Sequence, residues 1–166
     1  TRMNNGKYLE EALENVTPTN FCIGVAGYPE KHFEAPNIEA DIENLKIKVD
    51  AGASYIVTQM FFDNRKYFRF RNACIEAGIT VPIVAGIKAI SAMNDIRFLP
   101  QSFHIDLPND LVNAVRKCKT DKEAREVGVE WATMQSKELI KEGVPGVHYY
   151  TYGISDNVAK IVKSSF

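Results

Sequence analysis

Short apolar runs alternate with amphipathic segments along most of this chain. Four runs are nearly continuous in apolar and β-branched residues, and they predict strands at residues 21–26, 55–58, 82–85 and 147–151. A continuous apolar run is typical of a parallel strand covered on both faces of its sheet, whereas a half-exposed antiparallel strand alternates. The pattern therefore predicts a parallel sheet buried on both sides.

The segments between these runs are predicted to be helices. In the first, Ile38, Ile42, Leu45 and Val49 recur at helical spacing and form one apolar stripe. Further helices are predicted at 65–77, 121–141 and 157–163. Residues 91–118 contain two X-Pro breaks, at Leu99-Pro100 and Leu107-Pro108, and predict two short helices with 103–105 extended between them.

The helix predicted at 121–141 has the clearest local signals. It opens with Thr120-x-x-Glu123, the spacing of a capping box. Its buried face is predicted to consist of Ala124, Val127, Trp131 and Met134. Like two helices before it, this helix is followed by a glycine at the position where a left-handed residue ends a helix; the three are Gly52, Gly78 and Gly143.

Strands that alternate with helices predict right-handed β/α units. The pattern fits either an open doubly wound sheet or part of a (β/α)₈ barrel, and by itself it leaves that choice open. Residues 1–20 are mostly polar and end in Thr17-Pro18-Thr19-Asn20, so they are predicted to form a lead-in helix and turn. Residues 1–166 are predicted to form a single domain.

Composition narrows the class of protein. Twenty basic and twenty-one acidic residues leave a net charge of -1, so no strong field favours nucleic acid or an anionic membrane. No uncharged apolar run approaches the roughly 20 residues that span a bilayer. Cys22, Cys74 and Cys118 lack zinc-ligand spacing, which predicts reduced thiols and no metal site. We therefore expect a cytoplasmic protein.

Candidate ligand-binding residues follow the predicted strands, because parallel α/β proteins bind ligands at the carboxyl ends of their strands. The segment Gly27-Tyr28-Pro29-Glu30-Lys31-His32 lacks the P-loop lysine and the dinucleotide fingerprint. Tyr28 and His32 could stack on a ligand, although spacing alone favours an ordinary surface loop.

A helix face and a strand end could each bind a ligand or have a purely structural role. Asp41, Asn44 and Lys48 share one helix face and could hold a hydroxyl-rich, phosphorylated ligand, although a solvated helix flank is the more common meaning of such a trio. Gln59 ends the second strand, where its amide could pair with a planar heterocycle or could instead satisfy loop backbone.

Three segments in order and spacing resemble methylenetetrahydrofolate reductase, and the resemblance covers nearly the whole chain. They are residues 23–32 with Tyr-Pro-Glu-x-His, residues 41–53 ending in Asp-Ala-Gly-Ala, and Thr58-Gln59-Met60-Phe61-Phe62-Asp63. The resemblance implies the second half of a (β/α)₈ TIM barrel that binds FAD. Such an enzyme reduces 5,10-methylenetetrahydrofolate to 5-methyltetrahydrofolate with hydride from NADH or NADPH, in one-carbon and methionine metabolism.

The resemblance also implies roles for particular residues. Gln59 would pair with the pterin ring, Asp95 would contact folate, and Leu99 would cover the site that folate and the nicotinamide share. The flavin would be held by Tyr28, His32, Ala35, Asp41, Asn44 and Lys48.

This chain departs from the family pattern in three places. Gly86-Ile87-Lys88-Ala89 replaces the more usual Gly-Ile/Leu-x-Pro, and Ile154 stands where relatives can present a basic residue. The general acid and an Arg-Gly-Asp segment are expected before Thr1. By itself the chain is therefore expected to be inactive. We expect it either to pair its open sheet edges with another copy, as a homo-oligomer, or to remain partly disordered.

Two other classes of protein stay open beside the enzyme. One is a noncatalytic flavin- or folate-binding or assembly module. The other is an aldolase-like, phosphate-binding barrel, which Gln59 and the trio of Asp41, Asn44 and Lys48 argue against.

Overall fold

The computed structural model describes residues 5, 7–8, 11–12, 14, 17–153 and 155–166. At its centre is a four-stranded sheet in the order β3-β4-β5-β6, in which every pair of neighbours is parallel. The strands are β3 (Gly24–Gly27), β4 (Tyr55–Thr58), β5 (Ile83–Ile87) and β6 (Val147–Tyr149). This arrangement confirms the predicted parallel α/β fold, and neighbours in sequence are neighbours in the sheet, as in half of a barrel.

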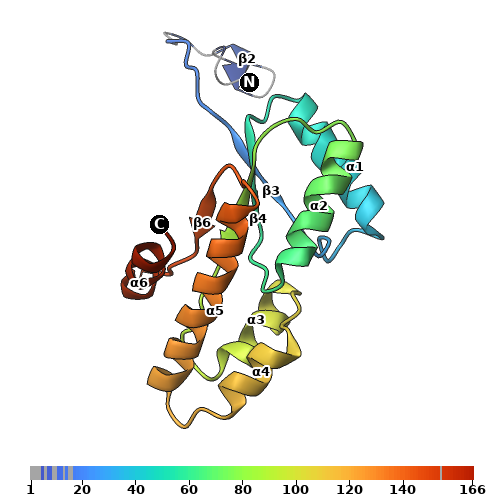
Figure 1. Ribbon diagram of the computed structural model, residues 1–166. Helices are drawn as coiled ribbons and strands as arrows, with labels where there is room; N and C mark the ends of the chain where they lie inside the picture. The colour runs from blue at the N-terminus through green and yellow to red at the C-terminus, as the bar shows by residue number, and fades with distance from the viewer. Residues whose placement is uncertain (1–4, 6, 9–10, 13, 15–16, 154) are drawn as a thin grey trace.

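The described residues include six helices beside the sheet, all within or close to the segments predicted to be helical. They are α1 (Ile38–Asp50), α2 (Asn64–Glu76), α3 (Asp95–Phe103), α4 (Asn109–Arg116), α5 (Asp121–Lys141) and α6 (Asp156–Ser165). In Figure 1, α1 and α2 lie side by side along the sheet, whereas α3 and α4 lie beyond the end at which the strands finish. The long helix α5 packs against α2, α4, α6 and β5.

Among the described residues, helices cover only one face of the sheet, which corrects the expectation of a sheet buried on both faces. On the covered face, Ile56, Ile83, Ala85 and Ile87 are fully buried in one apolar cluster with Leu45 of α1, Phe70 of α2 and Leu139 of α5. On the opposite face, Gly24, Ala26 and His148 are exposed and Val57 and Val84 are half-buried. Apolar runs predicted the burial of the strands but not which element would cover each face.

The predicted helix ends are confirmed. Gly52, Gly78 and Gly143 have φ values of 112°, 77° and 69°, in the region where a side chain would be strained. The Thr120 hydroxyl accepts a hydrogen bond from Glu123 N at 3.2 Å, as in a capping box. The Glu123 carboxylate, however, accepts from Lys119 N at 2.7 Å, one residue earlier than the capping box predicts.

The lead-in helix predicted for residues 1–20 is wrong where the structure describes that segment. There, β1 (Lys7–Tyr8) pairs antiparallel with β2 (Glu11–Ala12), at the top of Figure 1. Residues 17–20 are irregular rather than a turn. Short helices gain most of their stability from tertiary packing rather than from their local sequence, so the local pattern does not decide the structure of this segment. Residues 1–4, 6, 9–10, 13 and 15–16 lie outside the described residues.

Two details of the helices also differ from prediction. Pro100 lies inside α3 instead of ending it; the helix continues to Phe103, and His104 then ends it at φ 53°. Leu99 is fully buried at that point, and its packing offsets the backbone hydrogen bond that Pro100 cannot make. The segment predicted to be extended, residues 103–105, therefore begins in a helix.

Met134 is 59% exposed, although it was predicted to be buried. The buried stripe of α5 follows small and polar side chains instead, namely Ala124, Gly128, Ala132, Gln135, Ser136 and Leu139. A side chain at Gly128 would collide with the backbone of Ile90, so this glycine permits the close approach that rotates Met134 outward.

Candidate functional site

One side chain from the end of each strand gathers at the carboxyl edge of the sheet. Side chains alternate between the two faces of a strand. The last residue of each strand lies on the face that the helices cover; these residues are Gly27, Thr58, Ile87 and Tyr149. The residue that follows each strand therefore lies on the opposite, open face; these residues are Tyr28, Gln59, Lys88 and Tyr150. Backbone bonds from Gln59 N to Gly27 O, 2.8 Å, and from Tyr150 N to Ile87 O, 2.9 Å, continue the ladder into this layer.

The loop after β3 brings three of the predicted flavin residues together. The rings of Tyr28 and His32 meet edge to face with centroids 4.6 Å apart. The backbone N–H of His32 donates to Asp41 Oδ2 at 2.8 Å, which ties the loop to the first turn of α1. Partial burial and the nearby Asp41 carboxylate raise the pKa of Tyr28, so its hydroxyl stays a neutral donor.

Ala35, Asn44 and Lys48 complete the predicted set. The Ala35 carbonyl accepts from Lys31 Nζ at 2.6 Å, so this residue fixes the loop through its backbone. Asn44 and Lys48 are exposed on the turns of α1 that follow Asp41. The charge pair on this helix is Lys46 with Asp50, and in the part of the chain that is described Lys48 has no ion-pair partner. The trio therefore shares a face with its outer groups accessible.

Gln59 shows features of both alternatives stated for it. Its side-chain oxygen accepts from Met60 N at 2.9 Å, which is the role of an amide that satisfies loop backbone. Among the described residues its NH₂ group has no partner, and the side chain is only half-buried. Gln59 and Tyr28 both line a cavity of about 10 Å³, so the two predicted sites adjoin.

The predicted folate residues beyond β5 lie in different surroundings from each other. Asp95 Oδ2 accepts from Ser91 N at 2.7 Å and Ala92 N at 3.2 Å, and so shapes the turn before α3. Leu99 is 1% exposed and belongs to an apolar cluster with Met60 and other residues, whereas its neighbour Phe98 is 50% exposed. The structure thus places Asp95 at the surface of this edge and Leu99 beneath it.

A polar cluster that sequence reasoning missed joins two loops to the first turn of α2 at the same edge. Glu30 Oε2 accepts from Lys66 Nζ at 2.6 Å and from Asp106 N at 2.9 Å, and Lys66 also bonds the Asp106 carboxylate at 2.6 Å. Burial raises the pKa of Glu30 in spite of these bonds. Burial alone would lower the pKa of Lys66, but its bonds to Asp106 and Glu30 raise it above the ordinary value.

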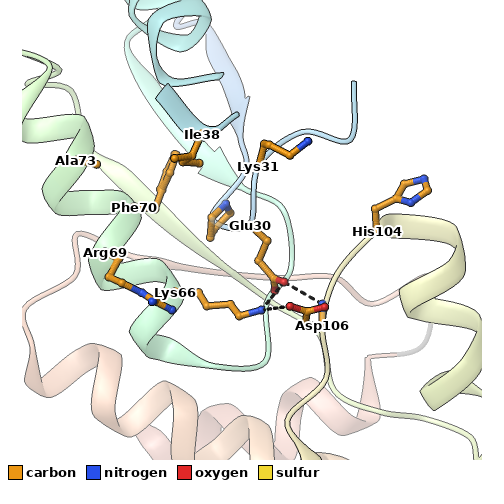
Figure 2. Close-up of a pocket in the computed structure, with 10 residues that line it drawn as sticks. Glu30, Lys31, Ile38, Lys66, Arg69, Phe70, Ala73, His104 and Asp106 are labelled. Carbon is orange, nitrogen blue, oxygen red and sulfur yellow. Dashed lines mark hydrogen bonds and ion pairs between the residues drawn. The ribbon is translucent and has the colours of Figure 1, made fainter. Parts of the chain in front are cut away.

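This cluster borders a cavity of about 450 Å³ between the loop after β3 and α2 (Figure 2). Ile38, Phe70 and Ala73 form its apolar side, and none of the nine predicted flavin and folate residues lines it. Glu30 was part of the Tyr-Pro-Glu-x-His string, so the signal was present, but its partners lie 36 and 76 residues away.

Lys88 is the second residue that sequence reasoning missed. It belongs to the string at residues 86–89 that departs from the family pattern, is only 7% exposed and lies directly after β5. The sequence did contain a signal for it. Val84 and Gly86 lie on the open face, and Lys88 is the charged residue that continues this alternation beyond the end of the strand.

The fold defines a protein of parallel β/α units, and its candidate ligand site lies where the strands end. A family model described as methylenetetrahydrofolate reductase matches residues 6–165. The chain therefore belongs to the methylenetetrahydrofolate reductase family.

Individual relatives show the extent of the match. The chain is 41% identical over 133 residues to the 5,10-methylenetetrahydrofolate reductase of Escherichia coli K12, covering 80% of this chain and 45% of that protein. It is 34% identical over 146 residues to a probable methylenetetrahydrofolate reductase (NADPH) of Caenorhabditis elegans, covering 87% and 22%. The chain thus spans less than half the length of these relatives.

A solved structure supports the fold alone. It is described as an uncharacterized protein from Clostridium thermocellum that binds two copies of 5-methyl-5,6,7,8-tetrahydrofolic acid. The similarity covers 87% of this chain and 52% of that chain, with a TM-score of 0.60 and 17% sequence identity. Within the described residues, no helix is both long and apolar enough to cross a membrane.

Proposed function

We propose that this chain forms the flavin- and folate-holding part of a methylenetetrahydrofolate reductase. The reaction is the reduction of 5,10-methylenetetrahydrofolate to 5-methyltetrahydrofolate, with NADH or NADPH as hydride donor and FAD as carrier. The observation that carries the proposal is the carboxyl edge, where the Tyr28, His32 and Asp41 cluster adjoins Gln59 in a chain that the family model matches almost throughout.

The residues present fit a flavin dinucleotide. Asp41, half-buried, offers a carboxylate to ribityl or ribose hydroxyls, and the exposed Lys48 ammonium offers a charge that offsets phosphate. Asn44 lies between them in the sequence and offers both donor and acceptor groups. The loop after β3 contributes Tyr28, His32 and Ala35. When bound, the flavin supplies the hydride chemistry, and these residues orient it.

For the folate substrate, Gln59 is the residue whose chemistry fits best. Its NH₂ group, which has no partner among the described residues, and its oxygen can pair with the neighbouring acceptors and donors at the edge of a pterin ring. Asp95 and Leu99 are proposed to flank the same ligand, with Leu99 acting from beneath the surface. The proposal assigns this chain binding and orientation, in a cytoplasmic homo-oligomer, and places the general acid outside residues 1–166.

Flavin retention tests the cofactor part of the proposal. The chain is mixed with FAD and desalted, and its visible absorption is recorded for the wild type and for the double variant Asp41→Asn/Lys48→Met. We expect the wild type to retain a flavin band and the double variant to bind FAD at least tenfold more weakly. The control is Lys46→Met/Asp50→Asn, which removes an exposed charge pair from the same helix and leaves the predicted trio intact.

Two outcomes would contradict this part: a wild type that retains no flavin, or a double variant that retains as much as the control.

A second measurement separates the enzyme from a noncatalytic binding module. Oxidation of NADH or NADPH is followed with 5,10-methylenetetrahydrofolate present, in a flavin-loaded protein that joins residues 1–166 to the general acid proposed to lie outside them. Flavin and folate binding by that protein without turnover would favour the binding module over the enzyme.

A further inference from the structure

Lys88 is a buried cation at the edge where the ligands are proposed to bind. It follows β5 directly, its residue is 7% exposed, and strand alternation places it on the open face with Gln59 and Tyr150. Buried lysines are rare unless the charge is paired. The groups that surround its ammonium therefore decide what the residue can do.

The direct partners of the Lys88 ammonium are neutral. Nζ donates to Ala89 O at 3.1 Å and to Ser91 Oγ at 3.3 Å, and it lies 5.2 Å from the centre of the Tyr152 ring. In the described portion of the chain, no carboxylate oxygen lies within the 4.0 Å of Nζ that defines an ion pair. Asp95 acts on the Lys88 charge from beyond that distance, and its Oδ2 accepts from Ser91 N and Ala92 N instead.

An ammonium has three N–H donors, and the two oxygens above account for two of them. A buried charge without a counter-ion is costly, since water is excluded and no anion replaces it. Burial accordingly lowers the pKa of Lys88, with Asp95 opposing the shift. An oxyanion placed against Nζ would use the third donor and remove this cost.

We propose that Lys88 binds an oxyanion of the ligand held at this edge, a carboxylate or a phosphate, and thereby contributes to substrate specificity. The inference rests on the proposed function for the identity of the ligand, because folate carries carboxylates and a dinucleotide carries phosphates. Lys88 would act on the charged part of that ligand, while Gln59 acts on the heterocycle.

A purely structural role makes different demands. If Lys88 serves only to hold the turn at residues 89–91, neutral replacements should lower stability and leave anion affinity unchanged. Ser91→Ala removes one of the bonds of that turn and keeps the charge, so it reports on the structural role alone. Lys137→Met is the matched control, because it removes an exposed lysine from α5.

The test measures dissociation constants by calorimetry for three ligands: 5-methyltetrahydrofolate, its analogue with both glutamate carboxylates converted to amides, and ADP-ribose. Lys88→Gln keeps a donor for Ala89 O and removes the charge, and Lys88→Met is a second neutral variant should the first not fold. We expect a neutral variant to lose at least tenfold in affinity for one charged ligand, and Lys88→Arg, Ser91→Ala and Lys137→Met to stay within threefold of the wild type.

The pattern of losses identifies the source of the oxyanion. A loss for 5-methyltetrahydrofolate that is absent for the amide analogue identifies a carboxylate, and a loss for ADP-ribose identifies a phosphate. Unchanged affinity of the neutral variants for both charged ligands overturns the proposal.

If the wild type binds none of the three ligands, the proposed function fails separately. Inorganic phosphate then decides: it should raise the melting temperature of the wild type above a chloride control but not that of Lys88→Gln, and equal shifts overturn the role of Lys88.

Discussion

The two faces of the central sheet differ in what their side chains do. On the covered face, Ile56, Ala85 and Ile87 are fully buried against helices and carry no polar group. On the open face, Tyr28, Gln59 and Lys88 follow the strand ends with hydroxyl, amide and ammonium groups. β4 and β5 each supply both sets, because alternate residues point to opposite faces.

Within a single strand, the residues that stabilise the fold are therefore different from the residues proposed to bind the ligand. A change on the covered face should act on the free energy of unfolding and reach the ligand only through it. A change on the open face should act on ligand affinity with little effect on unfolding. Neighbouring residues of one strand therefore provide matched tests, described below in decreasing order of their expected effect on stability.

The largest effect is expected for Ile56→Ala in β4. Ile56 is 0% exposed, so truncation leaves a cavity among α1, α2 and the sheet, and should lower the free energy of unfolding by about 2–5 kcal/mol. Val57→Ala, one residue along and half-buried on the open face, should cost less than about 1.5 kcal/mol. Urea denaturation followed by circular dichroism measures both. Equal losses would show that the open face is packed as firmly as the covered one.

The next effect concerns the polar cluster of Glu30, Lys66 and Asp106, which joins two loops to the first turn of α2. Lys66→Met leaves the buried Glu30 carboxylate without its cation and should cost about 2 kcal/mol at neutral pH. Asp106→Asn removes a partner whose side chain is 83% exposed and should cost less than about 1 kcal/mol. Chemical denaturation of both variants at pH 7 checks this difference.

The pH dependence of Lys66→Met has a definite sign. Burial already raises the pKa of Glu30 above its ordinary value of 4.5, so the folded state binds this proton more tightly than the unfolded state. Stability contributed by protonated Glu30 is therefore present below pH 4.5 and is lost as pH rises through the raised value. Without Lys66 the pKa should rise further, so the deficit of the variant should shrink towards acidic pH. A deficit independent of pH would assign the loss to packing of the lysine stem instead.

Adjacent tyrosines at the end of β6 give a smaller effect. Tyr149 faces α5, where its hydroxyl lies 2.8 Å from Ser136 Oγ, and Ser136 itself donates to Ala132 O at 2.7 Å. Tyr149→Phe should therefore lose one hydrogen bond and about 1 kcal/mol. Tyr150 is on the open face and donates to Thr58 O at 2.9 Å, so Tyr150→Phe should cost about 0.5 kcal/mol. Thermal unfolding of the two variants compares them, and the reverse order would contradict the assignment of faces.

Local features of this chain could be predicted from its sequence, because they depend on nearby residues. The helix at 121–141 has its predicted bounds, and the glycines that end three helices have the expected backbone angles. Features that depend on tertiary packing could not. Gly128 meets the backbone of Ile90, which rotates α5 and exposes Met134, and Pro100 stays helical because Leu99 is buried.

The candidate site divides in the same way. The strand ends and the shared face of Asp41, Asn44 and Lys48 follow from strand and helix periods, which can be counted along the sequence. The bonds of Glu30 to Lys66 and Asp106 span 36 and 76 residues, so no local pattern indicates them. The charge of Lys88 could be recognised in the sequence, but its burial could not. That burial depends on the turn at Ser91 and on Tyr152, which lie near Lys88 only in the folded chain.

The smallest effect on stability is expected for Gln59→Ala, and it tests the separation of the two faces most directly. The Gln59 side chain makes one local bond, to Met60 N, so its removal should change the free energy of unfolding by about 0.5 kcal/mol. Affinity for 5-methyltetrahydrofolate should nevertheless fall about tenfold, since about 1.4 kcal/mol of pairing with the pterin would be lost. The control is Gln101→Ala, an exposed glutamine of α3, which should leave both quantities unchanged. Denaturation and calorimetry on the same preparations measure them, and a loss of folate affinity that only follows a loss of stability would mean that Gln59 supports the loop rather than the ligand.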